Sequence, residues 1–441
     1  MNNNFDTICA IATPLSVGGV GVIRVSGERS YEIVQKYFSK EISPKKINHG
    51  WIVDGEKRID EVILLPFIAP NSFTGEDVIE IQTHGSPVVV KEVLNLLLGA
   101  GARLAERGEF TKRAFLNHKI DMTQAEAVLD LIHAKTEKSA NLSASNLAGA
   151  LRVEINNIKQ TITEILAKII ASLDFPEDVA EVDYRDIETV LAKAVSKIDK
   201  ILNSARSHNI LREGAKVAIV GQPNVGKSSL FNALLSLNRA IVTDVAGTTR
   251  DTINETLDIK GIALTLTDTA GIRDDENIDK VEQIGISNAK EAIAQADLIL
   301  CLYDGLKSLQ AEDEAIFAMC PQGVPKLLIS TKADICADGE GLKVSSVTLF
   351  GIDELKNAIY DKIIGLDQLE FEFSTNQRQQ ECLRMARRAL ENALNETRLE
   401  QLQDLISIDI KSALLALDEI TGELVTDEIL THIFENFCIG K

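Results

Sequence analysis

The chain has few of the residues that build disulfide frameworks and metal centres, and it lacks a long apolar run. Its 441 residues include six cysteines, six histidines and 5% aromatic residues. The cysteines are scattered without Cys-x-x-Cys spacing, which argues against disulfides or a zinc site and favours reduced thiols in a cytosol. No apolar run approaches the ~18 residues of a membrane span, and the start resembles neither a signal peptide nor a transit peptide. We therefore expect a cytoplasmic protein of two to four domains, helix-rich and of the α/β type.

The charge balance is strongly acidic. The chain carries 66 acidic and 46 basic residues, which gives a net charge of −20. This excess argues against broad, nonspecific binding of nucleic acid, so an RNA would have to meet a local basic patch or be held by a partner protein. Arg384, Arg387 and Arg388 on one expected helix form a candidate patch, although such clusters are more often a solvated helix face.

A phosphate-binding motif lies in the middle of the chain. Residues 221–228 read Gly-Gln-Pro-Asn-Val-Gly-Lys-Ser and match the pattern G-x-x-x-x-G-K-[ST]. In this pattern the glycines let backbone N–H groups close around phosphate oxygens, the lysine reaches the terminal phosphates, and the hydroxyl holds Mg²⁺. A buried strand is expected at 216–220 and a helix from 229, which together place a helix N-terminus at the anion.

Three further motifs follow in the order found in small GTPases. Asp268-Thr-Ala-Gly271 comes directly after a strand-like run, and its aspartate can hold Mg²⁺ through water. Gly247-Thr-Thr-Arg-Asp251 lies between the two phosphate motifs and has a threonine suited to closing over Mg²⁺. Thr331-Lys-Ala-Asp334 ends an expected strand at 326–330, and Asp334 can accept from both donors on the guanine edge. These motifs predict a GTPase domain.

Two positions depart from the usual GTPase pattern. The guanine motif usually begins with asparagine, where this chain has Thr331, and the later guanine loop usually reads Ser-Ala-Lys, where it has Ser345-Ser346-Val347. We expect altered affinity for guanine and no switch to ATP, because threonine still forms hydrogen bonds and the later loop acts largely through backbone N–H groups. The predicted GTP-binding residues are Asn224, Val225, Gly226, Lys227, Ser228, Ser229, Thr243, Asp244, Val245, Ala246, Gly247, Thr248, Thr249, Asp268, Thr269, Ala270, Gly271, Thr331, Lys332, Ala333, Asp334, Ser345, Ser346 and Val347.

The glutamine that usually orients the attacking water is missing. Many GTPases place it directly after Asp-x-x-Gly, and this chain has Ile272 there, which cannot position water. Candidates to replace it in the following loop are Arg273, Asp274, Asp275, Glu276 and Glu282. Asn224 suggests a further device, because its amide and backbone carbonyls of residues 243–248 could ligate a monovalent cation. A K⁺ ion there would supply the charge that an arginine supplies elsewhere.

Periodicity divides the chain into four segments. Residues 1–118 mix expected strands at 7–12, 21–25, 62–65 and 77–81 with a helix at 88–98, which predicts an α+β domain. An apolar helical stripe runs from Ile155 to Leu173, and after Pro176 a second helix is expected at 187–205. Helical spacing resumes at Leu383. We expect an N-terminal domain at 1–118, helical segments at 119–210 and 370–441, and a GTPase domain at 213–366. The helical segments form one discontinuous domain that carries the GTPase as an insertion, or alternatively two separate domains.

Motifs outside the GTPase segment indicate a family. The motifs are Asn-Ser-Phe-Thr-Gly-Glu-Asp-Val-Ile-Glu-Ile-Gln at 71–82, Gly-Glu-Phe-Thr-Lys-Arg-Ala-Phe-Leu-Asn at 108–117 and Phe-Cys-Ile-Gly-Lys at 437–441. With the asparagine-containing phosphate loop and Gly-Thr-Thr-Arg-Asp, they resemble the MnmE (TrmE) family of tRNA modification GTPases over the whole chain. The motifs near the two ends of the chain are more specific to this family than the GTPase motifs, because ribosome-assembly GTPases share the GTPase motifs.

The resemblance implies a tetrahydrofolate-binding fold for the N-terminal domain, which would also help to form a homodimer. The ligand would be 5-formyl- or 5,10-methylene-tetrahydrofolate. Arg24, Glu80 and Lys119 match the family's folate contacts, and Lys441 completes them from the C-terminus. Without the resemblance, Arg24 and Glu80 at strand positions would more often be a structural pair. Cys438 lies near the folate site in this family, so it has a role in the chemistry or orders the tail.

The resemblance also implies how the GTPase domains would act. They would meet across the nucleotides of the dimer, and Glu282 would position the attacking water. The implied metal ligands are Asn224, Thr243, Val245 and Thr248 for K⁺, and Ser228 and Thr249 for Mg²⁺. With an FAD-dependent partner, MnmG (GidA), in a heterotetramer or larger assembly, the enzyme would add a carboxymethylaminomethyl or aminomethyl group to carbon 5 of the tRNA wobble uridine. Folate would supply the bridging carbon, and GTP hydrolysis would gate the chemistry.

Two other functions stay open at this point. A ribosome-assembly GTPase would explain residues 213–366 but leaves the N-terminal domain and the terminal Cys-Ile-Gly-Lys without a role. Tight folate binding would speak against it. A folate-dependent methyltransferase regulated by its GTPase domain would transfer one carbon without a flavin partner.

The expected cation site gives a first testable prediction. At equal ionic strength, GTP turnover in K⁺ should exceed turnover in Na⁺ by at least about tenfold, a modest part of the ~10³-fold or more that an arginine finger supplies. Steady-state phosphate release in the two salts measures this ratio. Equal rates would remove the cation from the mechanism.

Overall fold

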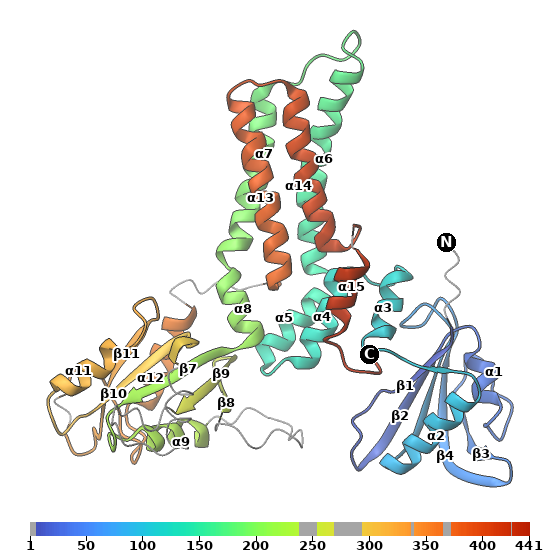
Figure 1. Cartoon of the computed structure of the whole chain (residues 1–441), viewed down its shortest axis with the longest axis horizontal. Coiled ribbons are helices and arrows are strands. Elements are labelled where there is room, and N and C mark those ends of the chain that lie inside the picture. The colour runs from blue at the N-terminus through green and yellow to red at the C-terminus, as the bar shows by residue number, and fades with distance from the viewer. Residues whose placement is uncertain (1–5, 238–253, 269–292, 337–338, 365–371, 425) are drawn as a thin grey trace. The chain divides into compact units, whose positions relative to one another are not determined.

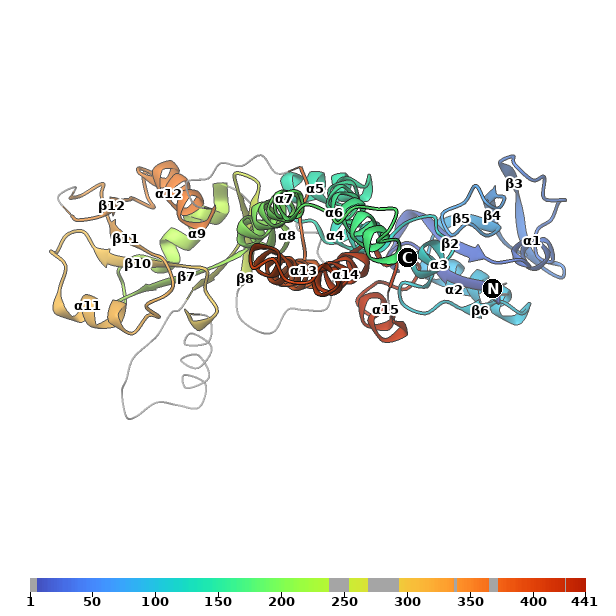
Figure 2. The same cartoon turned by 90° about the horizontal axis from the view of Figure 1, so that it is seen from above.

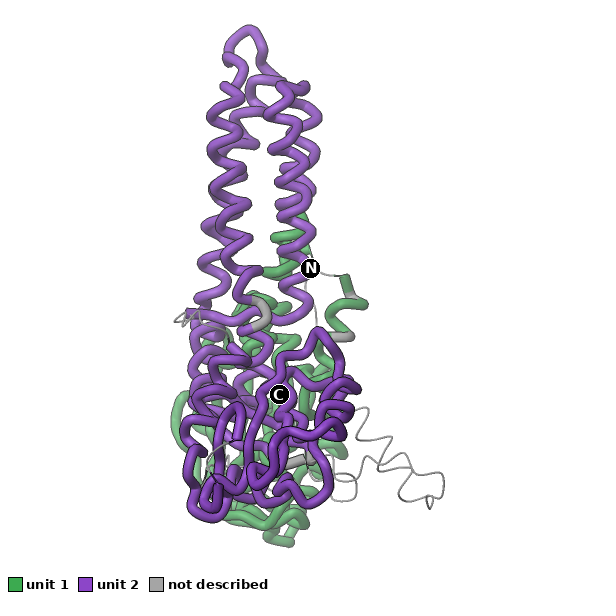
Figure 3. Tube along the Cα trace, turned by 90° about the vertical axis from the view of Figure 1, so that its left-hand side faces the viewer, with its two compact units in different colours: residues 1–129, 415–441 green, residues 130–414 purple. Residues whose placement is uncertain are grey.

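The computed structural model describes residues 6–237, 254–268, 293–336, 339–364, 372–424 and 426–441. It contains two compact units, coloured separately in Figure 3. Unit 1 comprises residues 1–129 and 415–441, and unit 2 comprises residues 130–414. Unit 1 therefore collects segments from both ends of the chain. None of the described helices is both long and apolar enough to cross a membrane.

Unit 1 contains a six-stranded sheet with the strand order β3-β4-β5-β2-β1-β6. The strands are β1 (Ile8–Ile11), β2 (Gly18–Ser26), β3 (Asn48–Asp54), β4 (Lys57–Phe67), β5 (Val78–Gly85) and β6 (Arg103–Leu104). Neighbours are antiparallel except for β1 and β6. Helices α1 (Ser30–Gln35) and α2 (Pro87–Gly99) accompany it. Ile23, Ile81, Val93 and Leu97 belong to one core, which joins the sheet to α2.

Four of the strands match sequence expectations, and the fifth long strand does not. The runs at 7–12, 21–25, 62–65 and 77–81 became β1, β2, β4 and β5, and the helix expected at 88–98 is α2. Strand β3 was not predicted, because its sequence, Asn-His-Gly-Trp-Ile-Val-Asp, begins with polar residues and a glycine that hide the alternation. Gly50 is required there, since a Cβ atom would lie 2.7 Å from the Phe38 ring.

The C-terminal segment of the chain packs into unit 1. Helices α3 (Glu109–Leu116), α4 (Met122–His133) and α15 (Asp427–Phe434) lie in this region. Met122, Leu430, Phe434 and Phe437 form one buried cluster. Gly108 has φ of +65° and faces the two phenylalanines, so a side chain there would collide with them. The tail then continues as a single bridge between Arg107 and Ile439.

Unit 2 contains an elongated helical bundle. Helices α6 (Ala150–Asp174), α7 (Tyr184–Asn203), α13 (Gln377–Arg398) and α14 (Gln403–Thr421) run side by side in Figures 1 and 2. Residues 415–421 at the end of α14 belong to unit 1. The isoleucine stripe from Ile155 to Ile169 is buried, as helical spacing predicts. Leu173 is an exception, because its side chain is 42% exposed at the last turn of α6. The helix ends at Asp174, directly before Phe175 and Pro176.

Unit 2 also contains a six-stranded sheet with the order β12-β11-β10-β7-β9-β8. The strands are β7 (Ala215–Gly221), β8 (Asn254–Ile259), β9 (Ile262–Asp268), β10 (Leu298–Asp304), β11 (Lys326–Thr331) and β12 (Leu342–Lys343). All neighbours are parallel except β8 and β9. The strand order changes direction at β7, with β9 on one side and β10 on the other. Open α/β sheets bind ligands beyond the carboxyl ends of the strands at such a point.

Helices flank this sheet and join it to the bundle. They are α9 (Lys227–Leu237), α11 (Ala311–Ala318) and α12 (Ile352–Ile364), and α5 (Glu137–Leu147) and α8 (Ala205–Glu213) lie at the junction. His208 Nδ1 is 3.1 Å from Thr375 Oγ1, and Gln380 Nε2 donates to Asn209 Oδ1 at 2.9 Å. These bonds fasten the chain entering the sheet segment to the chain leaving it. Burial lowers the pKa of His208 to about 4, so the imidazole is neutral at pH 7.

A buried arginine organises the carboxylates of unit 1. The Arg113 side chain is 1% exposed and contacts Asp6 at 3.1 Å, Glu76 at 3.2 Å and Glu109 at 2.8 Å. Burial raises the pKa of Glu109, but hydrogen bonds from Arg103, the Glu106 backbone and Arg113 outweigh it and leave the pKa below its ordinary 4.5. The stability that this carboxylate contributes is present at neutral pH and is lost as the pH falls below 4.5 through the folded-state pKa.

This cluster predicts a large effect of Arg113→Met on the stability of unit 1. Removing one partner of a buried ion pair costs about 3–5 kcal/mol, because it leaves charges buried without compensation. Trp51 on β3 is the only tryptophan of the chain, so its fluorescence during urea unfolding reports on unit 1. The control Arg29→Met removes a 52% exposed side chain that pairs with the exposed Glu32, so the free energy of unfolding should change little. Equal losses in the two variants would contradict the prediction.

Candidate functional site

The phosphate loop lies at the point where the strand order of the second sheet changes direction. Strand β7 ends at Gly221, and α9 begins at Lys227. Gly221 has no room for a side chain, since a Cβ atom would lie 2.2 Å from the Leu302 carbonyl oxygen on β10. Asn224 and Gly226 have φ of +64° and +99°. These positive values turn the backbone so that the loop can wrap around an anion.

Lys227 lies inside this loop. Its side chain is buried, and Nζ donates to the backbone carbonyls of Gly221 at 2.8 Å and Gln222 at 2.9 Å. The ammonium group is therefore held at the mouth of the loop, from which it can meet a phosphate. Ser228 and Ser229 follow on the first turn of α9 with exposed side chains. The helix N-terminus and the lysine give this loop a positive character.

The guanine motif is joined to the phosphate loop by a hydroxyl group. Thr331 ends β11, and its Oγ1 is 2.7 Å from the Val225 carbonyl oxygen and 3.0 Å from that of Tyr303. The single hydroxyl proton is shared between the two carbonyls, so the contact links β11, β10 and the loop. The threonine hydroxyl therefore forms its hydrogen bonds within the chain. What this means for guanine affinity stays a prediction.

The next residues of the motif form an ion pair and a solvated carboxylate. Lys332 has φ of +60°, and its Nζ contacts Asp304 Oδ2 at 2.7 Å. Burial raises the pKa of Asp304, but hydrogen bonds from Lys332 and the Leu306 backbone outweigh it, so the pKa lies below its ordinary value. Asp334 is exposed and accessible to a ligand. Sequence reasoning missed Asp304, although its place at the end of a buried strand was a usable signal.

The later loop is built around a buried serine. Ser345 donates its N–H to the Phe350 carbonyl at 2.9 Å, and its Oγ accepts from the backbone of Val347 at 3.3 Å and Thr348 at 3.2 Å. Ala333 donates its N–H to the Val344 carbonyl at 3.1 Å. The bond from Ala333 to Val344 places this loop beside the guanine motif. Val347 is exposed.

Several predicted site residues lie outside the described residues. They are Thr243, Asp244, Val245, Ala246, Gly247, Thr248, Thr249, Thr269, Ala270, Gly271 and Glu282. The backbone of Asp268 is described as the end of β9, where it lies opposite Ile219 of β7 in the parallel register. The end of β9 therefore comes next to the start of the phosphate loop. Of the four expected K⁺ ligands, Asn224 is the one that lies among the described residues.

The folate residues expected in unit 1 are partly brought together. Arg24 and Glu80 lie opposite each other on β2 and β5, and the guanidinium donates twice to Glu80 Oε1, at 2.9 Å and 2.7 Å. Its third contact is the Gly440 carbonyl at 3.2 Å, and the Phe110 ring lies 5.5 Å away. The pair is therefore satisfied within the chain, and it touches the C-terminal tail directly before Lys441. Sequence reasoning missed the Gly440 carbonyl.

The other expected folate residues have different surroundings. Lys119 Nζ donates to the Pro70 carbonyl at 2.8 Å and not to the Arg24–Glu80 pair. Lys441 is half-buried, and its N–H donates to the Cys438 carbonyl at 3.3 Å. Cys438 is an exposed free thiol. The tail thus adopts an ordered turn in which the Cys438 side chain faces solvent.

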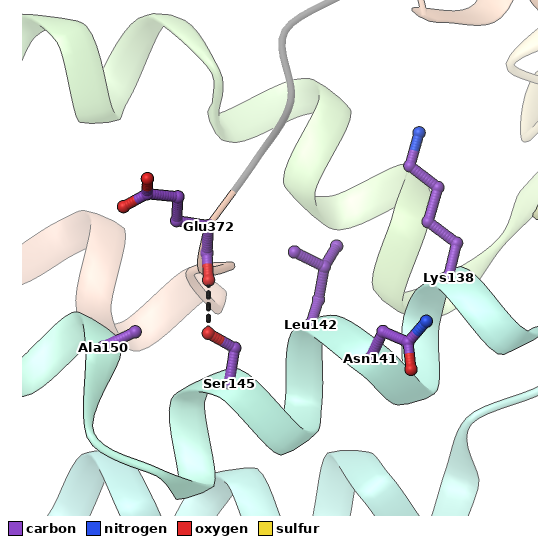
Figure 4. A pocket seen from close by; sticks show the side chains of 6 residues that line it. All are labelled: Lys138, Asn141, Leu142, Ser145, Ala150 and Glu372. Carbon is purple, nitrogen blue, oxygen red and sulfur yellow. Dashed lines mark hydrogen bonds between the residues drawn. The ribbon is translucent and has the colours of Figure 1, made fainter.

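Two further features do not belong to the nucleotide site. Arg384 pairs with Glu381, and Arg387 pairs with Asp199 and Glu391, so carboxylates offset the charge of the candidate RNA patch on α13. A pocket with a volume of about 430 Å³ opens beside α5. Lys138, Asn141, Leu142, Ser145, Ala150 and Glu372 line it, as Figure 4 shows. None of these six is a predicted GTP- or folate-binding residue.

Comparison with known proteins identifies the family. A family model described as "MnmE helical domain" matches residues 122–438, and a model described as "GTP-binding protein TrmE N-terminus" matches residues 7–119. The chain belongs to the MnmE family. It is 43% identical to the tRNA modification GTPase MnmE of Thermoanaerobacter sp. (strain X514), covering 99% of this chain and 100% of that relative. The MnmE of Thermotoga petrophila is 40% identical with the same coverage.

A solved structure of Aquifex aeolicus Era bound to GDP and AlF₄⁻ is similar to part of the chain. It is 25% identical and covers 40% of this chain and 66% of that structure, with a TM-score of 0.29. That score is too low to support an argument. The P-loop fold of the second sheet rests instead on its own strand order and on the loop after β7.

The shared hydroxyl predicts a specific effect at position 331. Thr331→Val keeps the shape of the side chain but removes the hydroxyl from two buried carbonyls, which costs about 1–3 kcal/mol. We expect GDP and GTP to bind about tenfold more weakly, as measured with a fluorescent guanine nucleotide. Thr331→Ser keeps the hydroxyl and serves as the control with nearly unchanged affinity. Wild-type affinity in the valine variant would show that the contact does not support the site.

Proposed function

We propose that the protein is a GTPase of tRNA modification that acts on the wobble uridine of certain tRNAs. With an FAD-dependent partner, it would add a carboxymethylaminomethyl or aminomethyl group at carbon 5. The observation that carries this proposal is the similarity over 99% of the chain to relatives named tRNA modification GTPase. The phosphate loop and the guanine motif meet at Thr331, which supports the GTPase half independently.

In the proposed nucleotide site, each described residue has a role that fits its position. Lys227 would meet the terminal phosphates from inside the loop, and Asp334 would accept from the guanine edge. Ser228, with Thr249, would hold a Mg²⁺ ion, which would neutralise charge on the phosphates. Asn224 would contribute to a K⁺ site with Thr243, Val245 and Thr248, and Glu282 would orient water. Ser228 is exposed at the start of α9, which is compatible with its role.

In the proposed folate site, Arg24, Glu80, Lys119 and Lys441 would hold a formyl- or methylene-tetrahydrofolate, which would supply one carbon. Arg24 and Glu80 form a partly exposed pair that is directly joined to the tail. A carboxylate can pair with the N–H edge of a pterin, and an arginine with an acidic tail. The same pair would hold the tail in place, so that Lys441 and Cys438 stay near the ligand.

The proposal includes a domain division and an assembly. The N-terminal domain would span 1–118, the helical domain 119–210 and 370–441, and the GTPase domain 213–366. The chain would form a homodimer through its N-terminal domains and associate with the flavoprotein partner. It would act in the cytoplasm. Because the only arginines predicted as an RNA patch are largely paired, we expect the partner to supply much of the tRNA contact.

Nucleoside mass spectrometry tests the proposed function. Cells that lack the gene should lose the carboxymethylaminomethyl- or aminomethyl-type wobble uridines from their tRNA. A plasmid copy should restore them, and a Lys227→Ala copy should restore less than about a tenth, because the loop loses the cation that meets the phosphates. Lys216→Ala is the matched control, since this exposed lysine precedes the loop and its Nζ donates to Gln295.

The outcomes separate the proposed function from its rival. Unchanged nucleosides in cells without the gene would overturn it, and abnormal ribosomal subunit ratios in the same cells would favour an assembly GTPase. Full restoration by the Lys227→Ala copy would show that the modification does not depend on the lysine of the phosphate loop.

A further inference from the structure

One end of the helical bundle carries apolar side chains that the proposed function does not use. The loop between α6 and α7 and the loop between α13 and α14 lie at this end in Figure 1. Six large apolar side chains on and beside the two loops are between 36% and 72% exposed. We call them the tip surface: Leu173, Phe175, Val179, Leu399, Leu402 and Leu405.

The two loops are tied together in a fixed arrangement. Tyr184 Oη donates to the Gln401 carbonyl at 3.0 Å, and Gln403 Nε2 donates to the Val182 carbonyl at 2.6 Å. Asp183 caps α7 by accepting from the Arg185 N–H at 2.9 Å. These bonds order the loop backbones before any partner arrives. An interface built on a preordered surface loses less conformational entropy on binding.

The tip surface is surrounded by negative charge. Segments 174–188 and 396–404 contain ten carboxylates and two arginines. One of the arginines, Arg398, already pairs with Glu188 at 2.8 Å. Such a surface repels nucleic acid and also repels an identical acidic surface on a second copy of the chain. The charge complementary to it is that of a basic protein.

We propose that the tip surface docks a protein whose own interface has basic residues around exposed apolar side chains. Single exposed leucines need no explanation, but here six large apolar side chains gather on two joined loops inside an acidic rim. An apolar centre with a polar rim is the usual anatomy of a protein interface. The rim steers the basic partner, and Phe175 and Leu402 insert as anchors. The proposal needs neither the GTP site nor the folate site.

Photo-crosslinking in cells tests the proposal on the full chain. A photoreactive amino acid replaces Leu402 or, as the control, Val153, an apolar side chain that is 59% exposed on α6 but lies outside the tip surface. Crosslinks at position 402 should exceed those at 153 and join one protein through a peptide of net positive charge. That protein is then purified, and its affinity is measured for the wild type, for Phe175→Ser/Leu402→Ser and for Val153→Ser.

The expected result is a dissociation constant at least about tenfold higher for the double variant and unchanged for Val153→Ser. Raising the salt from about 0.1 to 0.5 M should also weaken binding, because it screens the acidic rim. GTP turnover should be equal in all three proteins, which shows that they are folded. The proposal is overturned by crosslinks only to RNA or to a second copy of this chain, by no excess over position 153, or by a partner whose affinity ignores the double variant.

Discussion

The hydroxyl of Thr331 is the contact on which the described nucleotide site depends. It lies between the carbonyls of Val225 and Tyr303, so one proton joins the phosphate loop, a central strand and the guanine motif. The loop takes its turn from the positive φ of Asn224 and Gly226, and the Lys332–Asp304 ion pair stabilises the motif. The phosphate loop and the guanine motif therefore belong to one connected structure.

Sequence reasoning works best where burial imposes a period. The strands β7 and β11 were predicted because central strands of a parallel sheet are continuous apolar runs. Helix α6 was predicted because five isoleucines repeat at helical spacing. It fails where polar residues or glycine interrupt the pattern, as in β3. Leu173 continues the period of α6 but is exposed, because the helix ends one residue later and nothing described covers its last turn.

Contacts between distant parts of the chain could not be read from periodicity. Arg24 meets the Gly440 carbonyl across 416 residues of sequence, and no local signal predicts such a contact. The family resemblance placed Arg24, Glu80 and Lys441 in one site, and the structure brings the first two together beside the tail. It does not do so for Lys119, which is held by Pro70. Asp304 was missed for another reason. A carboxylate at the end of a strand is common, and the sequence alone does not show that this one pairs with Lys332.

The hydrogen bond between His208 and Thr375 in unit 2 has a consequence for the length of the segment between these two residues. His208 and Thr375 are 167 residues apart in sequence, yet their side chains are bonded. Closing a loop becomes only slightly harder with length, by about 0.6 kcal/mol for each doubling. The entropic cost of bringing the two ends together therefore depends only weakly on the number of residues between them. The segment between His208 and Thr375 can therefore differ in length at little cost to the closing of this loop.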